Sequence, residues 1–189
     1  SGGLRALFEP ASVAVVGASR TVGTLGHEYL RALQDGGFKG TLVPVNSSSS
    51  LLASLRCYPR LRAIPDPIDL AILAVPPAEA AVVADDCIEK GVKAVLLPST
   101  RYEDNGEKAL QEGRALVGKL RSAGIRVVGP SAMGVVNTDP SVSLHATFAP
   151  IGRRFAALPN PFTPLCGLWD LEVAVERLEV DAIVLARKA

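Results

Sequence analysis

The feature that most constrains this chain is residues 12–26, where an apolar run leads through closely spaced glycines into a helical pattern. The run is mostly β-branched, as expected of a strand that is buried on both faces of a parallel sheet. Gly17, Gly23 and Gly26 follow it. A strand, a glycine-rich turn and a helix N-terminus direct backbone N–H groups to one point, which attracts phosphate. We therefore expect a phosphate-bearing cofactor at this turn.

The rest of the chain alternates strand-like and helix-like segments. This order predicts an α/β fold in which a Rossmann-like parallel sheet carries helices on both faces, with ligands at the carboxyl ends of the strands. Residues 51–67 are rich in proline and are expected to form a connecting loop with little regular structure. The predicted strands are residues 13–16, 41–45, 69–75, 94–97 and 125–128, and the predicted helices are residues 4–8, a segment ending near 35, 78–90 and 106–123.

Composition excludes several classes of function. The chain has 189 residues, with 20 Lys and Arg against 19 Asp and Glu, so charge gives no reason to expect nucleic acid or an anionic membrane surface as a partner. We find no apolar run of 18 residues and expect no membrane span. The three cysteines are far apart, which favours reduced thiols in a cytoplasmic protein over disulfides or a metal site.

Two common phosphate-binding motifs do not fit the glycine-rich turn. The dinucleotide fingerprint needs a glycine where Ser19 stands, and the NAD-binding form also needs an acidic residue at the end of the second strand. That strand ends at Val45 and is followed by Asn46. The P-loop sequence is absent as well. These observations disfavour NAD and leave room for a nucleotide with an additional phosphate.

Several blocks of sequence, in order, resemble one family. The chain is similar to the N-terminal CoA-binding domain of the NDP-forming acyl-CoA synthetases, which resembles the succinyl-CoA synthetase α subunit and also occurs in Pat-type acetyltransferases. The resemblance covers residues 4–150. The blocks that carry it are residues 7–10, 12–19, 37–40, 44–46, 69–76, 91–94, 129–130, 134–137 and 146–150.

The resemblance implies a Rossmann-like domain that holds coenzyme A or an acyl-CoA across the strand ends. The diphosphate would lie on the turn after the first strand, the adenosine near the end of the second strand, and the pantetheine arm across the end of the third. The cofactor-binding residues implied in this way are Gly17, Ser19, Arg20, Thr21, Gly23, Gly26, Val45, Asn46, Val75, Pro76 and Pro77.

The sequence departs from the family pattern at the expected thiol end and after Pro150. Arg101 stands where the family usually has a glycine, and Ser131 where it has an asparagine. After Pro150 neither the second domain nor its phosphohistidine loop is recognisable. We therefore expect two units. Residues 1–150 form the CoA-binding domain, and residues 151–189 form an α/β appendage or remnant of a deleted domain, with a helix over 171–178 and a strand over 181–185. The appendage would add a strand to the sheet edge or pair with another chain.

Three functions remain open. The first is a CoA or acyl-CoA binding domain that is not catalytic alone. The second is a subunit of an acid–thiol ligase, completed by a partner domain or chain of the ATP-grasp type. The third is a regulatory or structural remnant that acts through dimerisation. We assign no catalytic residue and no metal ligand, because His27 and His145 are the only histidines and neither matches the family's phosphohistidine.

Overall fold

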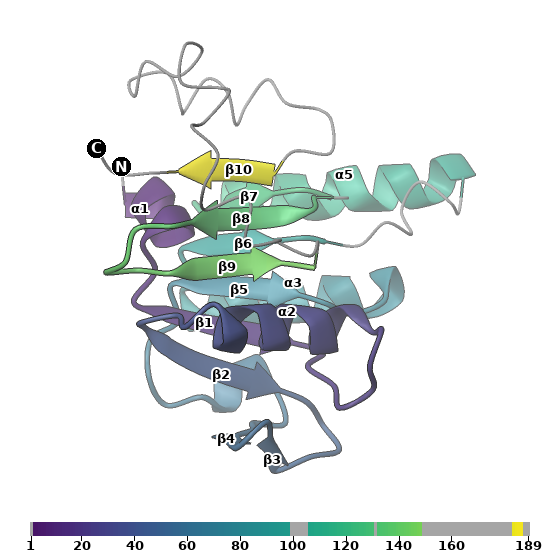
Figure 1. Cartoon of the computed structure of the whole chain (residues 1–189). Helices are drawn as coiled ribbons and strands as arrows, with labels where there is room; N and C mark the ends of the chain where they lie inside the picture. Colours follow the sequence, from purple (N-terminus) through teal and green to yellow (C-terminus); the bar gives the residue numbers. More distant parts are fainter. Residues whose placement is uncertain (1, 99–105, 131, 149–182, 187–189) are drawn as a thin grey trace.

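Five parallel strands form the central sheet of the computed structural model, which describes residues 2–98, 106–130, 132–148 and 183–186. The strand order is β2-β1-β5-β6-β7, and each neighbouring pair is parallel (Figure 1). This confirms the predicted Rossmann-like α/β fold. The strands are β1 (Ser12–Val16), β2 (Thr41–Val45), β5 (Leu70–Leu73), β6 (Ala94–Leu96) and β7 (Arg126–Val128).

Helices cover both faces of this sheet because successive strand residues point to opposite faces. In β1, Val13 and Val15 pack with α1 (Gly2–Phe8) and α2 (Leu25–Asp35). Ala14 and Val16 pack on the other face with α3 (Pro77–Lys90) and α5 (Gly106–Ser122). The helix predicted to end near residue 35 ends at Asp35, and those predicted over 78–90 and 106–123 differ from α3 and α5 by one residue.

A second, three-stranded sheet lies on the face that carries α2, and sequence analysis did not predict its β8–β9 hairpin. β8 (Gly134–Asn137) pairs antiparallel with β9 (Leu144–Thr147) and parallel with β10 (Ile183–Ala186). The buried Tyr29 of α2 joins the layers through a hydrogen bond from its hydroxyl to the Met133 carbonyl. The strand expected near residues 181–185 therefore exists as β10, but it joins β8 rather than the central sheet.

The expectation of an irregular loop over residues 51–67 was wrong in part. Two short strands, β3 (Leu51–Leu52) and β4 (Leu55–Arg56), form a hairpin, and a 3₁₀ turn, η1 (Leu61–Ala63), follows. Ala53 and Ser54, at the hairpin turn, both have positive φ, a conformation for which glycine or asparagine is the usual signal. The buried Leu52 anchors the hairpin in the core on the α2 side.

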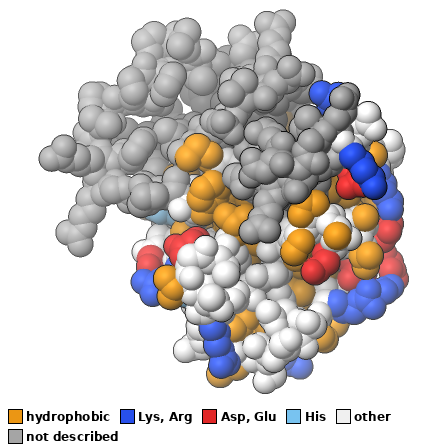
Figure 2. All heavy atoms as spheres, turned by 90° about the vertical axis from the view of Figure 1, so that its right-hand side faces the viewer, with side chains coloured by type: hydrophobic (Ala, Val, Ile, Leu, Met, Phe, Trp, Pro, Cys, Tyr) orange, Lys and Arg blue, Asp and Glu red, His pale blue; other side chains and the backbone are white. Residues whose placement is uncertain are grey.

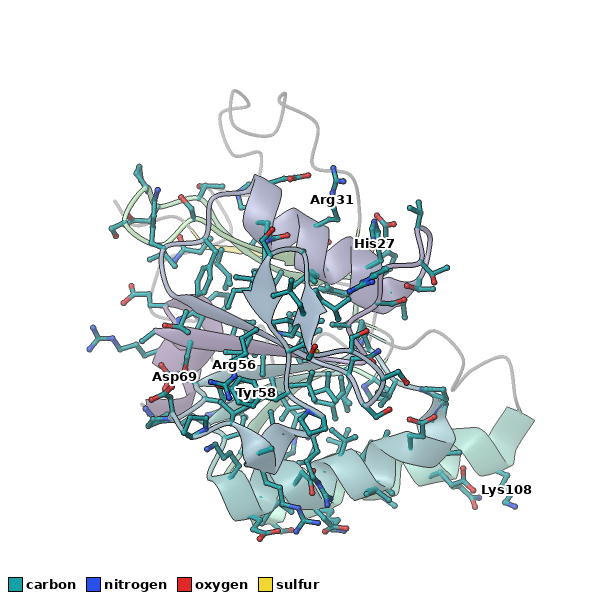
Figure 3. The ribbon with its side chains drawn as sticks, turned by 90° about the horizontal axis from the view of Figure 1, so that it is seen from below. His27, Arg31, Arg56, Tyr58, Asp69 and Lys108 are labelled. Atoms are coloured by element: carbon teal, nitrogen blue, oxygen red, sulfur yellow. The ribbon has the colours of Figure 1, made fainter. Side chains whose placement is uncertain are left out.

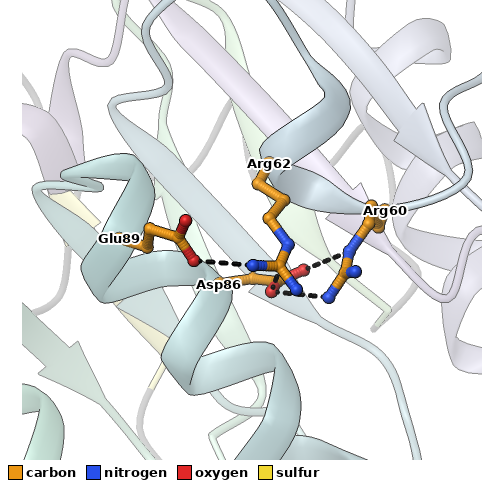
Figure 4. Close-up of polar contacts among 4 residues, drawn as sticks. All are labelled: Arg60, Arg62, Asp86 and Glu89. Carbon is orange, nitrogen blue, oxygen red and sulfur yellow. Dashed lines mark hydrogen bonds and ion pairs between the residues drawn. The ribbon is translucent and has the colours of Figure 1, made fainter.

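An ion-pair cluster fixes η1 to α3 (Figure 4). The buried Asp86 carboxylate accepts two hydrogen bonds from Arg60, at 3.0 and 3.2 Å, and lies 3.4 Å from Arg62. Arg62 also pairs with the exposed Glu89 at 2.8 Å. Arg60 and Arg62 precede Asp86 by 26 and 24 residues in the chain, so the cluster ties the segment that contains η1 to α3.

No helix within the described residues is long and apolar enough to cross a membrane. Several predicted features lie outside the described residues. They are most of the predicted appendage, including the helix over residues 171–178, together with Cys166 and Arg101.

Candidate functional site

The candidate site lies at the carboxyl edge of the central sheet, where the chain changes direction across it. From β1 the chain passes to β2 on one side and later returns to β5 on the other, and α2 and α3 leave the edge on opposite faces. Such a switch point is where open α/β sheets bind ligands. Seen from this side, hydrophobic and uncharged surface is interspersed with separate acidic side chains, and the basic side chains lie mainly toward the sides of the face (Figure 2).

Two of the predicted glycines allow the turn after β1 to pack closely against its neighbours. A Cβ atom on Gly26 would lie 1.9 Å from the Gly17 carbonyl oxygen, so a larger residue there would push α2 away from the turn. A Cβ atom on Gly17 would lie 2.4 Å from the Ala74 carbonyl oxygen, so a larger residue there would push the turn away from the segment that follows β5. Gly17 also has φ +85°, which favours glycine.

The turn presents N–H groups that have no acceptor within the described part of the chain. Thr24 caps α2: its hydroxyl accepts from the His27 N–H at 3.4 Å and donates to the Thr21 carbonyl at 2.8 Å. Unpaired N–H groups at a helix N-terminus carry the positive end of the helix dipole. The N–H groups of the turn that have no acceptor among the described residues are those of Ser19, Arg20 and Val22, and, in the first turn of α2, those of Leu25 and Gly26.

The side chains of the turn hold its own backbone. The Ser19 hydroxyl accepts from the Thr21 N–H at 3.0 Å. Arg20 extends away from the turn and donates to the Leu51 carbonyl of β3 at 2.7 Å. Gly23 has φ +83° and open space where a Cβ would lie. The predicted residues of this turn are thus brought together, but Arg20 is directed at the hairpin.

The first turn of α2 adds two side chains that sequence reasoning did not place in the site. Nδ1 of His27 lies 3.3 Å from the Ser19 carbonyl oxygen, and the Glu28 carboxylate accepts from the Gly23 N–H at 3.0 Å. Figure 3 shows His27 at the start of α2, one turn before Arg31. A threonine cap followed by an acidic residue in the first helical turn is the signal that could have revealed Glu28.

Val45 and Asn46 connect the turn to the end of β2. The Val45 side chain is buried, and its carbonyl accepts from the N–H groups of Gly17 and Ala18 at 3.0 and 3.2 Å. The Asn46 amide donates to the Ala18 carbonyl at 2.8 Å, and its side-chain oxygen accepts from the Ser48 N–H at 2.7 Å. Both residues therefore support the turn, one through its carbonyl and the other through its side chain.

Tyr58 is a neighbour of this region that the sequence did not indicate. Its carbonyl accepts from the Asn46 N–H, and its ring lies 5.0 Å from the Arg56 guanidinium (Figure 3). The Tyr58 backbone thus lies beside the residue that follows β2, while its ring packs against the core on the α3 side.

The remaining predicted residues, Val75, Pro76 and Pro77, lie at the start of α3. Val75 is half-buried against the core, Pro76 is exposed at the N-cap, and Pro77 occupies the first helical turn. The backbone here is tied to β1 by a 2.8 Å hydrogen bond from the Ala74 N–H to the Val16 carbonyl. The structure thus brings the predicted residues to neighbouring loops at one edge of the sheet.

The described residues offer no metal-binding cluster. No group of three His, Cys, Asp or Glu side chains that could hold a metal occurs among them. Burial raises the pKa of the Cys57 thiol, and burial followed by the nearby Asp86 carboxylate raises that of Cys87 to about 12. Both thiols are therefore protonated near neutral pH and are poor nucleophiles.

Comparisons with known proteins agree with this geometry. Residues 11–138 match the family described as the CoA binding domain. The chain is 41% identical over 151 residues to acetate–CoA ligase (ADP-forming) II of Archaeoglobus fulgidus, an alignment that covers 80% of this chain and 22% of that protein. It is 32% identical over 191 residues to the α subunit of acetate–CoA ligase (ADP-forming) I of Pyrococcus furiosus, covering 96% of this chain and 40% of the subunit.

A solved structure shares the fold. The dinucleotide-forming acetyl-coenzyme A synthetase 1 of Ca. Korarchaeum cryptofilum, in complex with phosphate and ADP, superposes with a TM-score of 0.73 at 36% identity. That match covers 79% of this chain and 32% of the synthetase. This chain therefore spans well under half the length of the relatives named here.

Proposed function

This chain belongs to the CoA binding domain family, and on that premise we propose that it binds coenzyme A or an acyl-CoA across the carboxyl edge of its central sheet. The ligand's diphosphate would lie on the turn formed by residues 17–26. The observation that carries the proposal is the set of N–H groups at the start of α2, which have no acceptor among the described residues. They lie at the strand-order switch.

The surroundings of the turn favour a ligand held by backbone more than by side chains. Gly26 allows α2 to pack directly on the turn, and Gly17 allows the turn to pack on the segment that follows β5. Ser19 is occupied with the Thr21 N–H and Arg20 with the Leu51 carbonyl. A diphosphate would therefore be recognised by fixed N–H dipoles and the helix N-terminus.

The other parts of the ligand are assigned by the loops that flank the turn. We propose that the adenosine lies near the end of β2, beside Val45 and Asn46, because no acidic residue follows that strand to select the ribose hydroxyls of NAD. The pantetheine arm would cross Val75, Pro76 and Pro77, which present apolar surface and no charge.

Titration calorimetry of the whole chain with CoA, acetyl-CoA, NAD and ATP tests the proposal, and a matched pair of variants tests the placement. Val22 and Val82 are both exposed valines, at 78% and 60%, on the turn and on α3. Val22→Asp adds a negative charge beside the proposed diphosphate and is expected to weaken CoA binding about tenfold at low ionic strength. Val82→Asp adds the same charge away from the turn and should leave the affinity unchanged. Equal effects of the two variants would contradict the placement, and no heat with either CoA species would contradict the function.

A second proposal concerns catalysis. Two of the relatives are named as α subunits of ADP-forming acetate–CoA ligases, and the chain spans 40% and 32% of their lengths. We propose that any acid–thiol ligase activity requires a further domain or partner chain with the nucleotide-binding and phosphate-carrying groups. Affinity purification from the native cell, followed by an assay for acyl-CoA-dependent formation of ATP or GTP, tests this. Activity of the isolated chain would contradict it.

A further inference from the structure

Glu28 places an uncompensated negative charge at the turn where the proposed diphosphate would lie. Its carboxylate accepts the Gly23 N–H at 3.0 Å. Among the described residues it has no ion-pair partner, since the cation in the turn, Arg20, donates to the Leu51 carbonyl. A carboxylate held at a helix N-terminus is stabilised by the helix dipole. The turn therefore already attracts an anion, supplied by the chain itself.

The charge is close to the N–H groups that remain open. Leu25 and Gly26 precede Glu28 by three and two residues in the same helix, so their Cα atoms lie about 5–6 Å from that of Glu28. The Glu28 carboxylate thus lies within about 10 Å of both N–H groups, which is no more than the screening length at about 0.1 M salt. A ligand phosphate that contacts these groups would be repelled by Glu28 unless salt screens the pair.

We propose that the charge of Glu28 lowers the affinity of this turn for phosphate-bearing ligands. This inference rests on the proposed CoA function. Glu28 has two opposing effects: its hydrogen bond to Gly23 holds the turn in shape, and its charge repels the diphosphate. Glu28→Gln separates them, because the amide oxygen still accepts the Gly23 N–H whereas the charge is removed.

The test is CoA titration of the whole chain at low ionic strength and at about 1 M salt. Glu28→Gln is expected to bind CoA about three- to tenfold more tightly than the wild type at low ionic strength, and the ratio should fall toward one at about 1 M salt. Glu112→Gln, on the exposed face of α5, removes the same charge far from the turn and should leave the affinity unchanged. Glu28→Ala lacks the acceptor and should bind CoA less tightly than Glu28→Gln.

The outcomes separate this inference from the function on which it rests. If the wild type and Glu28→Gln both take up no CoA, the proposed function fails and the inference fails with it. If the wild type binds CoA but Glu28→Gln binds no more tightly, or if its gain is the same at both salt concentrations, only the inference is overturned. A gain equal to that of Glu112→Gln would also overturn it, because the effect would then belong to net charge rather than to the turn.

Discussion

Replacing Gly26 by alanine tests whether the candidate site depends on the contact between α2 and the turn after β1. Alanine normally favours a helix over glycine by about 1 kcal/mol. At Gly26, however, the new Cβ would lie 1.9 Å from the Gly17 carbonyl oxygen and 2.7 Å from the carbonyl carbon. Both atoms belong to the backbone, so neither can turn away, and α2 must move outward by more than about 1 Å to reach van der Waals separation.

The size of the effect follows from these opposing contributions. Overpacking a close contact costs about 1–3 kcal/mol, and a clash with rigid backbone belongs at the upper end of that range. After the gain in helix propensity, we expect Gly26→Ala to lower the free energy of unfolding by about 2 kcal/mol. The melting temperature of a domain of this size should then fall by about 4–8 °C, and CoA affinity should fall because the N–H groups no longer converge.

Gly118 supplies the matched control. It also lies in a helix, α5, but it is exposed and a Cβ there would meet nothing within 4 Å. Gly118→Ala should therefore raise the free energy of unfolding by about 0.5–1 kcal/mol. Urea unfolding followed by circular dichroism measures both variants, and unchanged m values would confirm that stability alone has changed. If Gly26→Ala proved as stable as Gly118→Ala, the close approach of helix and strand would not be a constraint, and the argument for the turn would be refuted.

Two further predictions concern charges that hold the fold. Asp86→Ala should lower the free energy of unfolding, measured in urea, by about 1–2 kcal/mol, because Arg60 and Arg62 lose a buried acceptor. Glu89→Ala, at an exposed pair, should lower it by less than about 0.5 kcal/mol. Equal losses for the two variants would contradict this. Burial would raise the pKa of Asp69, but the Lys93 ammonium and backbone N–H groups together hold that pKa below its ordinary value. The stabilisation by Asp69 is therefore complete above about pH 4 and is lost as pH falls further. Asp69→Asn should lower the free energy of unfolding at pH 7 and have little effect near pH 2. A loss of stability that does not depend on pH would contradict the role given to the Asp69 charge.

The central sheet could be predicted because its signals are local. Each strand is a short apolar run, and Gly91 and Gly124 stop α3 and α5 with positive φ, as their places in the sequence indicate. Pro44 lies in β2, which is at the edge of the sheet, where a residue without an N–H group is tolerated. The glycine-rich turn was found for the same reason: its strand, glycines and helix follow one another directly in the chain.

The two hairpins were not predicted because their strands hold at most two consecutive apolar residues and no helical segment leads into them. The β3–β4 turn also uses Ala53 and Ser54 in a conformation that the sequence usually signals with glycine, asparagine or aspartate. The contact of Arg20 with Leu51 spans 31 residues, so no local rule predicts it. The assignment of Arg20 as a phosphate neighbour followed from family resemblance and stays a prediction.

Several polar side chains of the turn already bond to backbone groups, which favours recognition of a ligand by main chain. Ser19, Arg20 and Thr24 each bond to backbone groups, and His27 and Glu28 contact the two ends of the turn. Main-chain N–H groups of the turn have no acceptor among the described residues, and the Val45 carbonyl holds the start of the turn. Recognition by main chain depends on shape and charge rather than on the identity of a side chain. Substitutions that move the backbone or add charge should therefore alter binding more than conservative exchanges of the turn's hydroxyl groups.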